Sequence, residues 1–255
     1  MLWHKAWLET RWRFIIPMII MVCSTVAGVL SWPTVKQLVP LASGMTQPGY
    51  LGQQIQEAAQ LSKTYPGHIF NSLWSQNLRE MAALFAALLG TGGLLAQTSG
   101  GGALFTLSLP ASRNEIVGVR AAMGLAELFV MVFGSALLIP VFSPAVGESY
   151  GIVDAVAHAT FLFLGALSVF SLAFLLSTMF MDVWRPLLVT LFVAIAVGCA
   201  ELLVKPVARV GIFSAMSGNV FFTAGAVPWV GLLISVAVSA IMLWLAVRNI
   251  AARDF

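Results

Sequence analysis

The sequence predicts an all-α integral membrane protein, and three observations carry that prediction. Of its 255 residues, 60% are hydrophobic, and only 9% are charged. A soluble domain has about 25% charged residues, which keep its surface in contact with water. Charge-poor stretches of about 20 residues recur along the chain, and an α-helix of that length crosses a bilayer. The polar remainder is too dispersed for a separate soluble domain, so we expect one membrane domain over 1–255.

Six transmembrane helices are predicted from the places where charged residues are scarce. They cover 14–32, 81–97, 121–142, 155–181, 186–204 and 227–247. An even number of spans puts both termini on one side of the membrane. Basic residues favour that side, with Lys5, Arg11, Arg13, Arg113, Arg120, Arg185, Arg248 and Arg253 against Lys36, Lys63, Arg79, Lys205 and Arg209. By the positive-inside rule, we expect a multi-pass protein of the cell (inner) membrane with both termini cytoplasmic.

Two polar segments lie before the second span. Residues 1–13 place Trp3, Trp7 and Trp12 among charged residues, which is typical of an elbow helix in the membrane interface. An ordinary aromatic belt before the first span is the alternative. Residues 33–79 form the longest polar stretch and are expected to be an outer loop. Within this loop, the pattern over 52–63 predicts a short amphipathic helix that covers the outer end of the bundle.

The segment between spans two and three has its own pattern of turns and caps. Three glycines at 100–102 allow the second span to end and the chain to turn. The apolar stretch 103–109 is too short to span, so we expect it at the cytoplasmic interface, and Pro110 ends it. Ser112 and Glu115 have the spacing of a capping box. The helix of the third span therefore starts at about Arg113.

The stretch GALFTLSLPASRNEIVGVR, over 102–120, resembles the signature of type-2 ABC exporter permeases. In that family, the segment is a cytoplasmic coupling helix that contacts the ATPase, which here corresponds to 98–113. The family's acidic residue before a Gly-Thr pair is replaced by Thr98, Ser99 and glycines. A polar contact with the ATPase is then either weaker here or supplied by Glu115. The matching positions are Gly102, Leu107, Leu109, Pro110, Ser112 and Arg113, with Arg120 at the usual basic position.

The resemblance implies the membrane-spanning subunit of an ATP-driven exporter for an amphiphilic or hydrophobic substrate. Its partners would be ABC ATPase subunits, a second permease chain (identical or related) and membrane lipids. The turn with Asp182 and Arg185, between spans four and five, would be a second cytoplasmic contact.

No phosphate-loop pattern occurs in the sequence, so ATP and magnesium are expected in the partner chain. We therefore expect neither catalytic residues nor a cofactor in this chain, and it is not predicted to be an enzyme. The scattered basic residues do not form the stripe that nucleic-acid binding needs.

Glu127 lies near the middle of the third span. An acidic residue at that depth costs roughly 2.5–3.5 kcal/mol, so it must face protein or water. A structural hydrogen bond to a neighbouring helix, or to the dimer partner, is favoured over a role in a substrate pathway. Two other functions stay open: a proton-coupled secondary carrier with Glu127 as the proton site, and a membrane-embedded lipid-modifying enzyme. Asp154 and His158 share a helix face but lack a second acidic partner, so no metal site is expected.

Three smaller features concern helix packing. Glu201 and Lys205 have the i, i+4 spacing of an ion pair at the membrane interface. Ser24 and Gly28 form a small-x3-small pair, which permits close approach of a second helix. The two cysteines, Cys23 and Cys199, lie in apolar runs and are expected to be buried thiols outside any disulfide.

Overall fold

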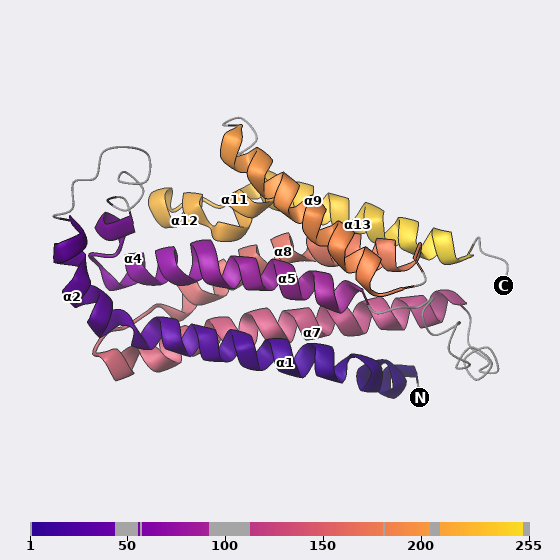
Figure 1. The fold of residues 1–255 in the computed structure, drawn as a ribbon, viewed down its shortest axis with the longest axis horizontal. Helices are drawn as coiled ribbons and strands as arrows, with labels where there is room; N and C mark the ends of the chain where they lie inside the picture. Colours follow the sequence, from indigo (N-terminus) through magenta and orange to yellow (C-terminus); the bar gives the residue numbers. More distant parts are fainter. Residues whose placement is uncertain are drawn as a thin grey trace.

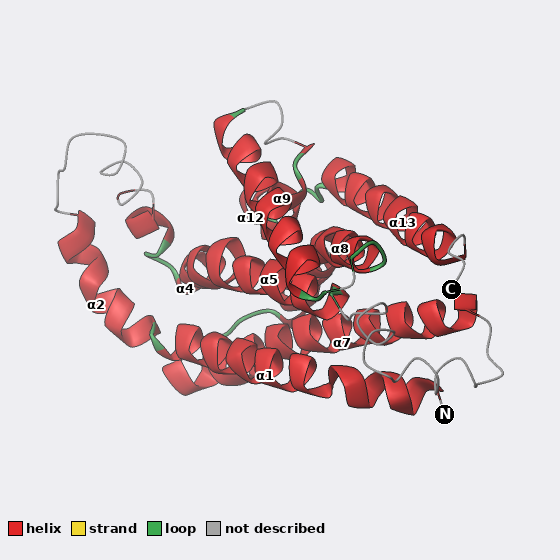
Figure 2. Cartoon of the chain, turned by 45° about the vertical axis from the view of Figure 1, so that its right-hand side comes forward, coloured by secondary structure: helices red, strands yellow, loops and turns green. Residues whose placement is uncertain are grey.

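The computed structural model describes residues 2–43, 56, 58–91, 113–180, 182–204 and 210–251. Within these ranges, every regular element is a helix, and Figure 2 shows how the helices cluster into one bundle. Five of them are long and apolar enough to cross a membrane, which confirms a helical, multi-pass design. They are α1 (Leu2–Leu30), α7 (Arg113–Phe142), α8 (Ile152–Ser177), α9 (Trp184–Leu203) and α13 (Trp229–Ala251).

A further helical rod runs through residues 65–90. It consists of α4 (Tyr65–Ile69), η1 (Phe70–Asn77) and α5 (Leu78–Gly90), which follow one another directly. The middle part is a π-helix, in which the N–H of Leu78 bonds to the carbonyl of Leu73, five residues back. Phe70, Leu73 and Trp74 are buried in the bundle core.

The rod corrects the predicted outer loop over 33–79. Residues 65–79 belong to a buried helix because apolar side chains at helical spacing continue upstream of Met81. Residues 32–43 also form a helix, α2 (Trp32–Ser43). Of the short helix predicted over 52–63, Gln56 and 58–61 are helical, and the other residues before 58 lie outside the described ranges.

The amino-terminal segment also differs from the prediction. A separate elbow helix over 1–13 would require a break before the first span, but α1 continues unbroken from Leu2 to Leu30. The break is unnecessary because Glu9 and Arg13 find polar partners on neighbouring helices. With 29 residues, α1 is about 43 Å long, which exceeds the ~30 Å apolar layer of a bilayer. Its charged first turns therefore extend past that layer.

Helix α8 lies at the centre of the bundle. It packs against α5, α7, α13 and the short helix α11 (Ile212–Ser217), while α1 packs along α7. A second short helix, α12 (Asn219–Ala224), follows α11, and the sequence analysis predicted neither. Helix α9 crosses the surface of the bundle at an angle (Figure 1). Helix α1 begins and α13 ends at the same end of the bundle, which we call the terminal end.

The small-x3-small pair on α1 produces the predicted close contact. A Cβ atom on Gly28 would lie 2.5 Å from Cδ2 of Leu73, so the glycine leaves room for this leucine of η1. One helical turn away, the Nδ2 of Asn77 donates to the Oγ of Ser24 over 2.6 Å. Ser24 and Gly28 therefore confirm the expected site of helix–helix approach.

Candidate functional site

The first turns of α1 and α7 are joined by ion pairs at the terminal end. Glu9 lies 3.9 Å from the Nζ of Lys5 and 3.8 Å from the Nη1 of Arg120. The Arg120 side chain is only 11% exposed, so its charge is mostly removed from water and depends on Glu9 for compensation. The start of α7 is thereby attached to α1.

A second polar contact ties α1 to the end of α5. The Nη1 of Arg13 donates to the carbonyl of Thr91 over 3.3 Å, where α5 has just ended. A cation at this position complements the free carbonyls of a helix carboxyl terminus. Thr91 is the last described residue before 92–112, and Arg113 is the first after it. Both flanks of the predicted coupling segment are therefore held by α1.

Glu127 lies on α7 and faces α1, as expected for an acidic residue in mid-span. It is 3% exposed, and Thr10 of α1 donates a hydrogen bond to its Oε1. The predicted structural hydrogen bond to a neighbouring helix is therefore confirmed. Its second oxygen, Oε2, has no hydrogen-bond partner among the described residues.

Most residues of the predicted coupling segment lie outside the described ranges; these are Leu107, Leu109, Pro110 and Ser112. Arg113 opens α7 as predicted, and Glu115 lies exposed in the first turn. The side chains of Trp3 and Trp12 are more than half exposed, whereas Trp7 is half-buried beside the ring of Phe14.

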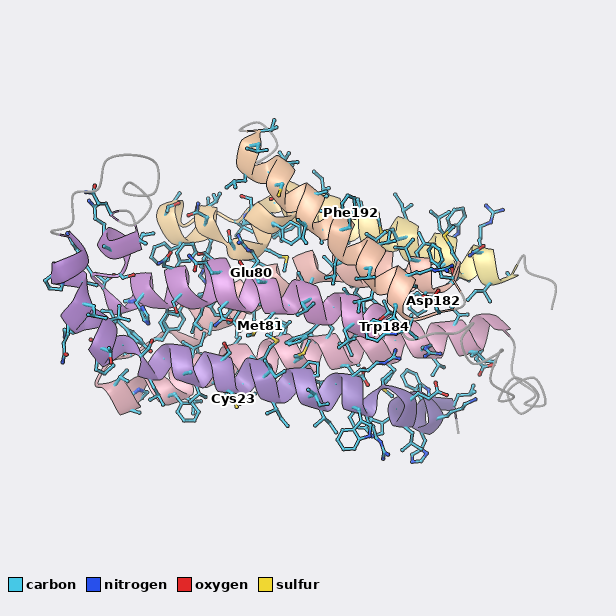
Figure 3. The ribbon with its side chains drawn as sticks, viewed as in Figure 1. Cys23, Glu80, Met81, Asp182, Trp184 and Phe192 are labelled. Carbon is cyan, nitrogen blue, oxygen red and sulfur yellow. The ribbon has the colours of Figure 1, made fainter. Side chains whose placement is uncertain are left out.

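The turn before α9 is closed by the predicted pair. The Oδ1 of Asp182 accepts from the backbone N–H of Arg185 over 2.7 Å, and the Oδ2 lies 3.1 Å from the Arg185 Nε. Figure 3 shows Asp182 and Trp184 toward the terminal end. The pair therefore lies on the same side as the amino terminus, which its predicted role requires.

A groove of about 640 Å³ opens between α5, α9 and α11. The charged residues among its described lining are Arg79, Glu80 and Glu201. The groove was not predicted, because Arg79 was assigned to the outer loop and Glu80 lay just before the predicted second span. The 3–4 residue spacing of Phe70, Leu73 and Trp74 is the signal that would have extended the helix through them.

Glu201 has partners in α11 that the sequence did not predict. The carboxylate is 7% exposed and accepts backbone N–H bonds from Phe213 (3.1 Å) and Ser214 (2.8 Å), in the first turn of α11. A Cβ on Gly211 would lie 2.1 Å from its Cδ, so glycine makes room for it. Lys205 lies outside the described residues. Glu201 thus anchors the short helix that covers this end of the groove.

An aromatic cluster surrounds His158 at the other end of the bundle. The ring stacks on Trp74 at 5.0 Å, and its Nδ1 donates to the carbonyl of Asp154 over 2.9 Å. In the part of the chain that the structure describes, no group of three metal-ligating side chains occurs. Nearby, the Nε1 of Trp74 donates to the Tyr150 hydroxyl over 3.1 Å, and burial raises the pKa of Tyr150 above its usual value.

The cysteines differ from the prediction, because both Cys23 and Cys199 are exposed. An apolar run predicts that a side chain avoids water, but it does not distinguish contact with protein from contact with lipid. Cys199 lines the groove between α5 and α9.

No protein-family model, curated protein or solved structure matches this chain. The function of the chain is therefore inferred from its own residues and their arrangement.

Proposed function

We propose that this chain is the membrane-spanning subunit of a type-2 ABC exporter, powered by separate ATPase subunits. The proposal starts from the resemblance over 102–120. Its main structural support is that Arg13 and Arg120 bind α1 to the two flanks of that segment, at Thr91 and through Glu9. A force on the segment would therefore reach α1, α5 and α7 together.

The coupling step follows from the stiffness of α7. This helix has 30 residues and packs on both α1 and α8. When ATP closes the ATPase pair, pressure near Leu109–Arg113 tilts α7, and packed helices respond by moving between discrete arrangements. Asp182 and Arg185 give the ATPase a second contact. The tryptophans at 3, 7 and 12 keep the first turns of α1 at the membrane surface.

The rod over 65–90 is the sixth span of this proposal. At 1.5 Å per residue, it covers about 39 Å, which is enough to cross the apolar layer. Six spans agree with the position of α1 and α13 at one end of the bundle. The excess of basic residues there favours cytoplasmic termini, and the resemblance to ABC exporters favours the inner membrane.

The second permease chain would cover the face of α9. Trp184, Phe192 and Ile195 are each at least 65% exposed there. Two such faces would enclose the transport pathway, with the groove between α5 and α9 in its wall. An apolar lining of this kind suits an amphiphilic or hydrophobic substrate.

Co-purification of an ATPase tests the proposal. The tagged chain is purified from its native membrane in a mild detergent and assayed for ATP hydrolysis, beside Arg113→Glu. We expect an ATPase with the wild type and its loss with Arg113→Glu. The matched control is Arg248→Glu, which reverses an exposed charge in the last turn of α13 and should keep the ATPase. A wild-type preparation without ATPase would refute the exporter.

A second variant pair separates docking from transmission. Arg120→Gln and Glu9→Gln each break the ion pair that joins α1 to α7. We expect both to retain the bound ATPase while substrate no longer stimulates hydrolysis. If stimulation survives in both variants, α1 does not transmit the force.

One observation favours a proton-coupled carrier as the second candidate. The buried Oε2 of Glu127 lacks a hydrogen-bond partner among the described residues, as a proton site inside the helix bundle could. In vesicles that contain only this chain, a pH gradient would then drive uptake, and Glu127→Gln would abolish it. The exporter proposal expects no such uptake.

A further inference from the structure

The groove between α5, α9 and α11 contains a carboxylate in an unusual position. The Glu80 side chain is 73% exposed, and Figure 3 places it on α5, well away from both ends of the bundle. A charged side chain that faces hydrocarbon at this depth costs roughly 2.5–3.5 kcal/mol. This face of α5 is therefore turned to water or to a bound molecule and not to lipid.

The charges of the groove do not balance. Among the described residues that line it, one arginine, Arg79, stands against two glutamates, so this part of the lining carries a formal charge of −1. The Glu201 carboxylate is buried and accepts two backbone N–H bonds, so it is not available to a ligand. The Nη2 of Arg79 forms an ion pair with the Oε1 of Glu80 at 3.9 Å, but this distance is too long for a hydrogen bond and the Glu80 side chain stays 73% exposed. Glu80 is the carboxylate that remains open to a cation.

The remaining wall is mostly apolar. The volume of the groove, about 640 Å³, falls in the range of roughly 300–1,000 Å³ typical of sites for drug-sized ligands. Such sites combine apolar walls with a few polar groups that fix the orientation of the ligand. The apolar residues that line the groove include Ala83 and Leu84 of α5, Leu191, Ile195 and Leu202 of α9, and Phe213 of α11.

We propose that this groove binds an amphiphilic organic cation, whose charged group pairs with Glu80 while its apolar body lies along α9. A hard inorganic cation would need several oxygen ligands, and Glu80 alone cannot provide them. An anionic amphiphile would meet a net negative lining. That the cation is also transported rests on the proposed exporter function, whereas its binding does not.

A pair of ions with the same shape and opposite charge tests the proposal. Tetraphenylphosphonium and tetraphenylborate are equilibrated with the purified chain in a neutral detergent, and bound ligand is measured by equilibrium dialysis. We expect the wild type to prefer the cation, and Glu80→Gln to lower its affinity roughly tenfold. Arg79→Gln removes the competing cation and should raise the affinity.

The control is Glu148→Gln, which removes a carboxylate outside the groove. Glu148 accepts from the Nε1 of Trp32, and the glutamine oxygen can still accept that bond. The Glu148→Gln variant should bind tetraphenylphosphonium with the same affinity as the wild type. Equal affinity for the two ions, or unchanged cation binding in Glu80→Gln, would overturn the proposal.

A steric variant covers the case in which Glu80→Gln does not fold. Leu84→Trp keeps Glu80 and fills the groove, because Leu84 lines it and is 44% exposed. It should abolish cation binding, and intact binding would count against the site. If the chain binds the cation but the cation does not stimulate ATP hydrolysis, the binding site is supported and its role in an exporter is refuted.

Discussion

Helices α8 and α9 have the same mean hydropathy but very different surroundings. In the most apolar stretch of each, 61% of the α8 residues are buried, against 17% of the α9 residues. Helix α8 packs against helices on several sides, whereas α9 carries Phe192 and Trp184 on its outer face, as Figure 3 shows. Apolar composition therefore does not say which helix occupies the centre of the bundle.

The difference follows from the solvent. In a bilayer, lipid tails are as apolar as leucine, so helices gain little by hiding apolar side chains from them. Close packing and hydrogen bonds decide which helices associate. At α8, Gly90 of α5 comes so close that a Cβ there would lie 2.5 Å from the carbonyl oxygen of Phe170. At α9, a Cβ on Gly198 would lie 3.9 Å from the Cδ2 of Phe213, which is an ordinary contact.

The largest effect is expected from truncating one phenylalanine on each helix. Phe170 of α8 is fully buried, and Phe170→Ala should lower the free energy of unfolding by about 3–5 kcal/mol. Phe192→Ala on α9, where the ring is 73% exposed, should leave the thermal midpoint of the single chain unchanged. Thermal unfolding followed by tryptophan fluorescence in detergent measures both. Equal losses would show that α9 is covered within one chain.

The groove offers a matched pair of glutamates. Glu201→Gln leaves one N–H of α11 facing an amide NH2 and should cost about 1.5–3 kcal/mol. Glu80→Gln changes an exposed side chain and should stay within about 0.5 kcal/mol. The same thermal assay compares them. If Glu201→Gln is neutral, the end of α9 is not anchored to α11.

Gly90, which packs against α8, and Gly198 of α9 allow a further comparison of packing at the two helices. Gly90→Ala forces α5 away from the α8 backbone, and we expect a loss of about 1–3 kcal/mol. Gly198→Ala has room for its methyl group and should stabilise α9 by up to about 1 kcal/mol, because alanine favours helix. Opposite shifts of the thermal midpoint would confirm the difference in packing. Shifts of the same sign would contradict it.

The smallest effect concerns the polar contact before α8. Tyr150→Phe removes the acceptor for the Trp74 indole and should cost about 0.5–1.5 kcal/mol at pH 8. Burial raises the pKa of Tyr150, so its stabilisation is complete below about pH 10 and declines as pH rises beyond that value. The variant should therefore lose stability less steeply between pH 9.5 and 11 (roughly) than the wild type. If the stability of the two proteins changes with pH in parallel, the Tyr150 hydroxyl is not buried.

Much of the helical layout could be predicted from charge spacing. The start of α7 at Arg113 and its end at Phe142 agree with the prediction, as do the positions of α8, α9 and α13 to within a few residues. The start of the second span was predicted too late in the chain, because Arg79 and Glu80 interrupt its charge-free pattern. Those charges are tolerated because they line a groove, and that groove depends on α9 and α11, more than 100 residues away.

The candidate site was likewise predicted only in part. The sequence predicted that Glu127 needs a hydrogen bond from a neighbouring helix, since an isolated carboxylate is costly in a membrane. It did not predict Thr10 as the donor, nor that Glu9 and Arg13 would keep α1 continuous through contacts with Arg120 and Thr91. Those partners come from other helices, and no local pattern encodes their distance.

The sequence by itself determined that this chain is helical and belongs in a membrane. The transfer of apolar side chains into lipid, and the need to satisfy every backbone group there, are additive over local segments. Only the tertiary structure decided that α8 is central, that α9 is peripheral and that Glu80 opens into a groove. These outcomes depend on shape and polar contacts between distant segments, because lipid provides no hydrophobic force to choose among helices of equal hydropathy.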